Sequence, residues 1–439
     1  MSRIPVDKVH DVMKEYTIGD GQDLIYDYEK SHGSYFYDAM RDEEYLDLFT
    51  FYATLPIGHN HPKLREDDFL DRLASVAVNK PSSTDIYTQE IAEFTKKFAE
   101  TAAPGWAEHF FFISGGTLAV ENALKTAMDW KIKKNFKRGK EEELGHQVIH
   151  FEDSFHGRSG YTLSLTNTFD PRKYKYFTRF DWPRVEAPAL RFPVTEEVKK
   201  DVKKQEQRSI EQINEAIEER GEDIASLIIE PIQGEGGDKH FRSEFFQKLR
   251  KICDENEIMF VLDEIQAGMG LTGEWWAYQN YDFEPDMIAY GKKSQVCGIM
   301  SNERVEEVED HCFEESSRLN STWGGNLVDM FRATKYLEII EEENLVQNAE
   351  EVGNYLQDAL LDLQEDLNAV SNVRGEGLMC AFDLPTTDIR DDVKEEAFER
   401  NLLILKSGER SIRFRPPLDL NEEEVDEGIS ILEKSIKSS

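Results

Sequence analysis

The chain has 439 residues and a mass of 50.8 kDa, more than one hydrophobic core usually organises, so two domains are expected. Its 88 acidic and 52 basic residues give a net charge of −36, and such a surface repels nucleic acid. No apolar run approaches the roughly 18 residues that a membrane span needs. Nucleic-acid binding and a membrane-spanning role are therefore both excluded.

The first residues and the cysteines favour a reducing compartment. Residues 1–16 lack the apolar core of a signal peptide, and we interpret them as the start of a mature cytoplasmic protein. The four cysteines, at 253, 297, 312 and 380, show no CxxC pair and no metal-binding spacing, as expected of reduced thiols. His59 and His61 lack acidic or cysteine partners at ligand spacing, so no metal site is expected.

Apolar, β-rich segments alternate with helical patterns along most of the chain, which is typical of a parallel sheet with crossover helices. Strands are expected at 109–113, 147–151, 161–165, 226–230, 258–263, 287–290 and 296–300, and helices at 118–137, 194–219, 243–256 and 326–344. Shorter strands follow at 378–382, 402–405 and 411–414, before a closing helix at 421–436. The pattern predicts an α/β fold in which 65–330 form a large domain. Residues 1–64 and 331–439 form a smaller α+β domain.

The strand expected at 258–263 ends in Asp263, and open α/β sheets bind their ligands at this end of a strand. Lys292 follows 29 positions later (292 − 263) and can return to the same crevice from the next strand. Such a pair suits pyridoxal 5′-phosphate, because the lysine forms an imine and the acid keeps the pyridine nitrogen protonated. At an effective dielectric near 20 the charge pair is worth roughly 4 kcal/mol at contact. The alternative is that Asp263 caps a helix and that Lys292 and Lys293 are solvated.

Further motifs have the residues that could bind a phosphorylated cofactor and a substrate with a carboxylate. Gly115, Gly116 and Thr117 lead from a strand into a helix, and free amides at a helix start bind anions. After the next strand, Phe155 can stack on the cofactor ring, and Arg158 can hold a substrate carboxylate with two hydrogen bonds.

Three more segments complete the series. Glu230 and Glu235 lie on a flexible loop after a third strand, 320–326 form a turn of small residues, and 412–418 bring two arginines from the second domain. Taken in order, these motifs resemble the class III aminotransferases of fold type I, from residue 47 to residue 418. Within that class, 291–300 and 317–326 resemble the L-lysine 6-aminotransferases.

The resemblance implies a role for each matching residue. Asp263 would pair with the pyridine nitrogen and Gln266 with the ring oxygen. Lys292 would form the imine; counting from Asp263 selects it, whereas counting back from Gly298 allows Lys293 as well. The phosphate would be held by Gly116 and Thr117 and by Thr322 of a neighbouring subunit, which implies a homodimer with a shared active site. Many members of the class have a tyrosine at the position of Phe155 and a Ser-Glu pair at 117–118.

The same resemblance implies transfer of the ε-amino group of L-lysine to 2-oxoglutarate, which gives L-glutamate and a 6-semialdehyde that cyclises. Arg158 and Asn320 would bind substrate, and Arg413 would hold the α-carboxylate of 2-oxoglutarate. Glu235 would cover Arg413 while L-lysine is bound and swing aside for 2-oxoglutarate. His156 is interpreted as a packing or capping residue, Cys297 as a small packing residue and Arg415 as structural.

Three other functions stay open at this point. One is an aminotransferase for ornithine, 4-aminobutyrate or a diamine. In the ornithine and 4-aminobutyrate enzymes a Gly-Gly usually follows the lysine, where this chain has Cys297-Gly298. The second is an amino-acid racemase of the same fold, and the third is a binding protein with a relict site.

The net charge of −36 predicts adaptation to high salt, because counterions screen the repulsion within an acidic surface. We expect the unfolding midpoint to rise between low salt and molar potassium chloride, as followed by circular dichroism. A midpoint that stays level or falls would instead indicate ordinary solubilising acidity.

Overall fold

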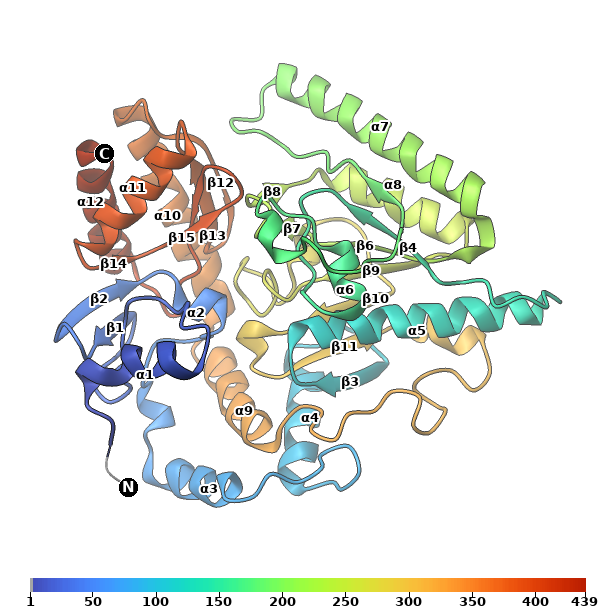
Figure 1. The fold of residues 1–439 in the computed structure, drawn as a ribbon, viewed down its shortest axis with the longest axis horizontal. Coiled ribbons are helices and arrows are strands. Elements are labelled where there is room, and N and C mark those ends of the chain that lie inside the picture. The colour runs from blue at the N-terminus through green and yellow to red at the C-terminus, as the bar shows by residue number, and fades with distance from the viewer. Residues whose placement is uncertain (1–2) are drawn as a thin grey trace.

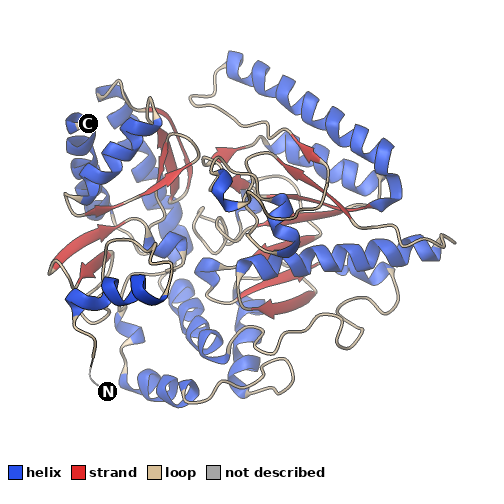
Figure 2. Ribbon diagram, in the orientation of Figure 1, coloured by secondary structure: helices blue, strands red, loops and turns tan. Residues whose placement is uncertain are grey.

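The computed structural model describes residues 3–439, and none of the helices in this range has the length and apolar character needed to cross a membrane. Its larger part is built on a seven-stranded sheet with the order β3-β11-β10-β9-β6-β4-β5 (Figures 1 and 2). The strands are β3 (His109–Ile113), β4 (Gln147–Phe151), β5 (Arg184–Val185), β6 (Ile224–Ile229), β9 (Met259–Asp263), β10 (Met287–Tyr290) and β11 (Cys297–Ser301). β11 is antiparallel to both neighbours, and the other adjacent pairs are parallel.

Helices cover both faces of this sheet (Figure 1). The helices are α4 (Gln89–Thr101), α5 (Gly116–Lys137), α7 (Glu196–Arg220), α8 (Ser243–Glu255) and α9 (Leu327–Glu342). Alternate residues of β9 point to opposite faces: Met259 and Val261 pack in the core with α5, whereas Phe260 and Leu262 pack in the core with α8. Because both faces are buried, β9 is apolar throughout until Asp263.

The C-terminal part contains a four-stranded antiparallel sheet with the order β12-β13-β16-β15. It consists of β12 (Ser371–Glu376), β13 (Met379–Asp383), β15 (Leu405–Ser407) and β16 (Ser411–Arg413), with α10 (Leu345–Asp366), α11 (Thr387–Phe398) and α12 (Glu422–Ser438). Near the N-terminus, β1 (Tyr35–Asp38) and β2 (Glu43–Asp47) form a sheet with β14 (Leu402–Leu403). The two ends of the chain thus share a sheet. The domain boundaries at 65 and 330 stay a prediction.

Smaller elements connect these parts. They are α1 (Val9–Tyr16), α2 (Thr50–Ala53), α3 (Asp67–Ala77), α6 (Gly160–Leu165) and the hairpin of β7 (Ile232–Gln233) and β8 (Lys239–His240). The backbone of α2 has left-handed φ values of +42°, +51°, +61° and +70° at its four residues. Asp47 stabilises the entry to this turn, because its Oδ1 accepts hydrogen bonds from the backbone N–H groups of Phe49 and Thr50 at 3.0 and 2.7 Å.

Most of the predicted strands and helices are confirmed, with two corrections. The strand predicted at 161–165 is wrong: these residues lie in helix α6, where 162–165 are buried. A short apolar run looks the same in a buried helix and in a strand, so periodicity does not separate the two. The single strand predicted at 402–405 is divided between β14 and β15, which belong to different sheets.

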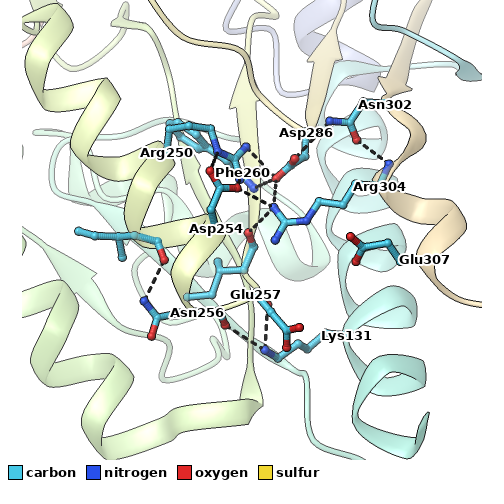
Figure 3. A network of polar contacts seen from close by, with 12 residues as sticks. Lys131, Arg250, Asp254, Asn256, Glu257, Phe260, Asp286, Asn302, Arg304 and Glu307 are labelled. Carbon is cyan, nitrogen blue, oxygen red and sulfur yellow. Dashed lines mark hydrogen bonds and ion pairs between the residues drawn. The ribbon is translucent and has the colours of Figure 1, made fainter. Parts of the chain in front are cut away.

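At the amino-terminal ends of β9 and β10, a charged network joins sheet and helices (Figure 3). Asp286 is almost wholly buried, and its Oδ2 accepts a hydrogen bond from the Phe260 N–H at 2.7 Å. The same oxygen pairs with Arg250 of α8 at 2.9 Å and with Arg304 at 2.8 Å. Asp286 therefore ties β9 to α8 and to the segment after β11, at the opposite end of the strands from Asp263.

Replacing Asp286 with alanine removes the buried partner of two largely buried guanidinium groups and of one strand N–H. We expect Asp286→Ala to lower the free energy of unfolding by about 3–5 kcal/mol, as measured by urea denaturation. Asp254→Ala is the matched control, because Asp254 contacts the same arginines but its side chain is 58% exposed. Its loss should stay below about 1 kcal/mol. Equal losses in the two variants would contradict this role of Asp286.

Candidate active site

Asp263 ends β9 and is held by two contacts. Its Oδ1 accepts a hydrogen bond from the Ile265 N–H at 3.1 Å, and its Oδ2 lies 2.8 Å from His156 Nδ1. Both side chains are buried. The interpretation of His156 as a packing or capping residue is wrong, because the imidazole contacts this carboxylate directly. Its position just after β4 was the available signal, since the carboxyl ends of β4 and β9 meet at the same edge of the sheet.

Glu230 lies behind this pair and links two loops of the site. Its carboxylate accepts hydrogen bonds from the N–H groups of Phe155 and Gly234, at 3.0 and 3.1 Å. Burial raises the pKa of Glu230 to about 7; nearby Asp263 also raises it, whereas His156 opposes the shift. The sequence left open whether Glu230 only supports the fold. These bonds give it a supporting role that positions Phe155.

The two adjacent lysines point to different places. Lys293 Nζ donates hydrogen bonds to the backbone oxygens of Leu55 and Pro416, both at 2.8 Å, and lies outside the site. Lys292 lines a cavity of about 540 Å³ together with Asp263 and Phe155. Removal of the Lys292 amine from water, together with the positive charges of Arg413 and Arg415, lowers its pKa to about 8. The geometry thus favours Lys292 over Lys293 as the reactive amine.

The start of α5 forms one wall of the cavity. Gly116 and Thr117 line it, and the N–H groups of the first helical turn are available to an anion there. The wall is tightly packed: a Cβ on Gly116 would lie 2.8 Å from Ile265 Cδ1, and one on Gly157 would lie 2.3 Å from Thr117 Oγ1. The absence of a side chain at these two glycines lets the backbone of Gly116 lie against Ile265 and that of Gly157 against Thr117.

Gln266 and the two arginines of 412–418 form the boundary between the cavity and the C-terminal part. Gln266 Oε1 accepts hydrogen bonds from Arg413 Nη1 at 3.0 Å and Arg415 Nη2 at 2.9 Å. Arg415 is fully buried and pairs with Asp238, as expected of a structural residue. Arg413 Nη2 donates to Glu235 Oε2 at 2.6 Å, so the predicted pair of Glu235 and Arg413 is present.

Arg158 lines a larger cavity of about 1010 Å³, which shares Phe155, Gln266 and Lys292 with the first. Within residues 3–439 it forms no ion pair, and its guanidinium carbon lies 5.8 Å from the centre of the Phe155 ring. Arg158 and Arg413 therefore line the same cavity. Lys173 also lines this cavity and pairs with Glu235, a contact for which the sequence carried no signal.

Asn320 and Thr322 are not brought together with the other residues within one chain. Both are exposed, and neither lines the two cavities. Asn320 Oδ1 accepts a hydrogen bond from Thr84 Oγ1 at 2.9 Å, and the Thr322 carbonyl accepts one from the Ser83 N–H at 3.1 Å. Their roles stay predictions. Cys297 lines the smaller cavity beside Lys292, and its thiol pKa is raised by burial.

The family model for class-III aminotransferases matches residues 17–436, so the chain belongs to this family. The L-lysine-epsilon aminotransferase of Streptomyces clavuligerus is 45% identical over 432 residues, which cover 98% of this chain and 94% of that protein. The protein of the same name from Mycobacterium tuberculosis is 46% identical, with coverage of 98% and 95%. The solved structure of the lysine aminotransferase from M. tuberculosis matches with a TM-score of 0.96 over 99% of this chain and 100% of that one, at 46% identity.

Class-III aminotransferases have the fold type I architecture and depend on pyridoxal 5′-phosphate. The cavity fits this cofactor. It combines an amine of lowered pKa, a buried carboxylate and a helix start that can receive a phosphate, within about 540 Å³. Buried His156 Nε2 has no hydrogen-bond partner within residues 3–439, as expected if a further group is to be bound near it.

Proposed function

We propose that the protein is an L-lysine 6-aminotransferase that transfers the ε-amino group of L-lysine to 2-oxoglutarate. The full-length similarity to L-lysine-epsilon aminotransferases supports this proposal. The observation that carries it is the pairing of Glu235 with Arg413 in a cavity that is also lined by Arg158, which forms no ion pair within residues 3–439. This arrangement leaves one carboxylate-binding arginine available and covers the other.

Such an arrangement suits a pocket that must accept two unlike substrates. L-Lysine reacts through its ε-amino group, so its only carboxylate lies at the far end, where Arg158 would hold it. Methylenes would then lie near Arg413, whose charge Glu235 neutralises. 2-Oxoglutarate carries a second carboxylate beside its keto group, and this carboxylate would bind Arg413 after Glu235 has moved. Asn320 would complete the substrate site.

The remaining residues would bind the cofactor and move protons. Bound pyridoxal phosphate supplies an electron sink for the substrate carbon that loses its proton. Asp263, positioned by His156, would keep the ring nitrogen protonated, and Phe155 would stack on the ring. Gln266 would bind the ring oxygen, and Gly116 and Thr117 the phosphate.

Lys292 would hold the cofactor between turnovers. Its Nζ would accept the proton from the ε-carbon of L-lysine and return a proton at the end of the half-reaction. The lowered pKa of Lys292, about 8, supports this role, because a neutral amine is needed to accept a proton.

A cytoplasmic homodimer with a shared active site is part of the proposal. Several large apolar side chains are exposed near the N-terminus and before α4, namely Tyr16, Ile18, Val78, Ile86 and Tyr87. Exposed apolar groups of this size favour contact with a partner, and we infer a second copy of the chain. Thr84 in the same segment contacts Asn320, so the turn with Thr322 lies beside this surface and could reach the partner's phosphate site. All four cysteines are free thiols, in keeping with the cytoplasm.

Amino-donor profiling with 2-oxoglutarate as acceptor tests the substrate. We expect kcat/KM for L-lysine to exceed that for ornithine, 4-aminobutyrate and putrescine by about tenfold or more. The pocket would select both the chain length of the donor and its α-carboxylate. o-Aminobenzaldehyde should trap a cyclic product from L-lysine. Lys292→Ala is the control and should lose turnover. A faster reaction with another donor, or racemisation without 2-oxoglutarate, would contradict the assignment.

A further inference from the structure

The Glu235 carboxylate contacts two cations, one on each oxygen. Oε2 accepts a hydrogen bond from Arg413 Nη2 at 2.6 Å, and Oε1 pairs with Lys173 Nζ. The Lys173 side chain is only 13% exposed, and its Nζ lies 5.4 Å from the centre of the Phe155 ring. Lys173 belongs to the short helical turn Pro171–Lys173, which lies between β4 and β5 of the seven-stranded sheet. Arg413 ends β16 in the C-terminal part. Glu235 thus bridges the two parts of the molecule.

The backbone that carries Glu235 is fastened to the C-terminal part. The Glu235 carbonyl accepts a hydrogen bond from the Gly408 N–H at 3.1 Å, and the Gly234 carbonyl accepts one from Ser407 Oγ at 2.6 Å. Arg374 Nη2 donates to the Gly237 carbonyl at 2.6 Å. Because these bonds hold the loop, the carboxylate can leave Arg413 by rotation of its own side chain while the backbone stays in place.

A carboxylate that leaves Arg413 without another partner would be a partly buried, unpaired charge, which is costly. Lys173 remains as its partner after such a rotation. We propose that Lys173 is a specificity-determining residue, which keeps Glu235 paired while Arg413 binds the α-carboxylate of 2-oxoglutarate. This inference rests on the proposed function. It adds Lys173 to the pair of Glu235 and Arg413.

The charge balance of the three residues points the same way. Lys173, Arg413 and Glu235 together carry +1 (two cations and one anion), so the group attracts one further carboxylate and becomes neutral when it binds. Without Lys173 the group carries 0, and the same carboxylate would bring it to −1. Binding of the α-carboxylate of 2-oxoglutarate therefore depends on Lys173. Binding of L-lysine does not depend on Lys173, because the carboxylate of L-lysine would bind at Arg158.

Lys173→Gln tests this inference through the two half-reactions. We expect KM for 2-oxoglutarate, and Kd for the unreactive dicarboxylate glutarate, to rise about tenfold, the effect of losing one charge-assisted contact. The lysine half-reaction, followed by the cofactor absorbance, should stay within about twofold. Lys173→Arg should restore glutarate binding, because it restores the cation. Lys175→Gln is the matched control, since it removes the same charge two residues away and outside the cavity.

Equal losses in both half-reactions, or an unchanged Kd for glutarate, would overturn the inference. If the unfolding midpoint fell in both Lys173→Gln and Lys173→Arg, Lys173 would have a purely structural role. This result would also overturn the inference. The glutarate measurement and the glutamate half-reaction do not involve L-lysine. A wild-type protein that reacts with glutamate but not with L-lysine would therefore refute the proposed donor while leaving the test of Lys173 valid.

Discussion

The contact on which the site depends is that between Asp263 and His156 at the carboxyl end of β9. Asp263 is 5% exposed, and an ionised carboxylate at such a depth is stable only with hydrogen bonds or opposite charge. The Ile265 N–H and His156 supply these from within the chain. The same depth lowers the pKa of Lys292 across the cavity. Burial thus brings the amine closer to its neutral form, while the two contacts of Asp263 hold the carboxylate in place.

A second set of charged residues lies on the side of the cavity that faces the C-terminal part. Arg413 and Arg415 both donate to Gln266 Oε1, so one amide oxygen fixes two guanidinium groups beside the cavity. Arg415 is paired with buried Asp238, whereas Arg413 is paired with Glu235 on a loop whose carboxylate is 28% exposed. The Arg415–Asp238 pair is buried on both sides, whereas the Glu235 side chain of the other pair is partly open to solvent. Arg413 at the end of β16 and Arg415 two residues later thus have different environments.

The sequence predicted the parts of the fold and site that arise from local patterns. An apolar run that ends in an acid, as at 258–263, marks both a buried strand and the sheet edge where ligands bind, so Asp263 and Lys292 could be placed together. Contacts between distant segments carry no such pattern. The partners of Lys173 and Lys293 lie on other loops, and only the folded chain brings them together. The helix α6 was missed for another reason, since its short apolar run fits either kind of element.

The central claim is that Lys292, and not Lys293, is the amine that meets the cofactor opposite Asp263. Borohydride reduction of the protein saturated with pyridoxal phosphate, followed by peptide mapping with mass spectrometry, tests it most directly. The account predicts one cofactor-derived adduct, on Lys292, which is absent from Lys292→Ala. An adduct on Lys293, or no adduct in the wild-type protein, would contradict the account.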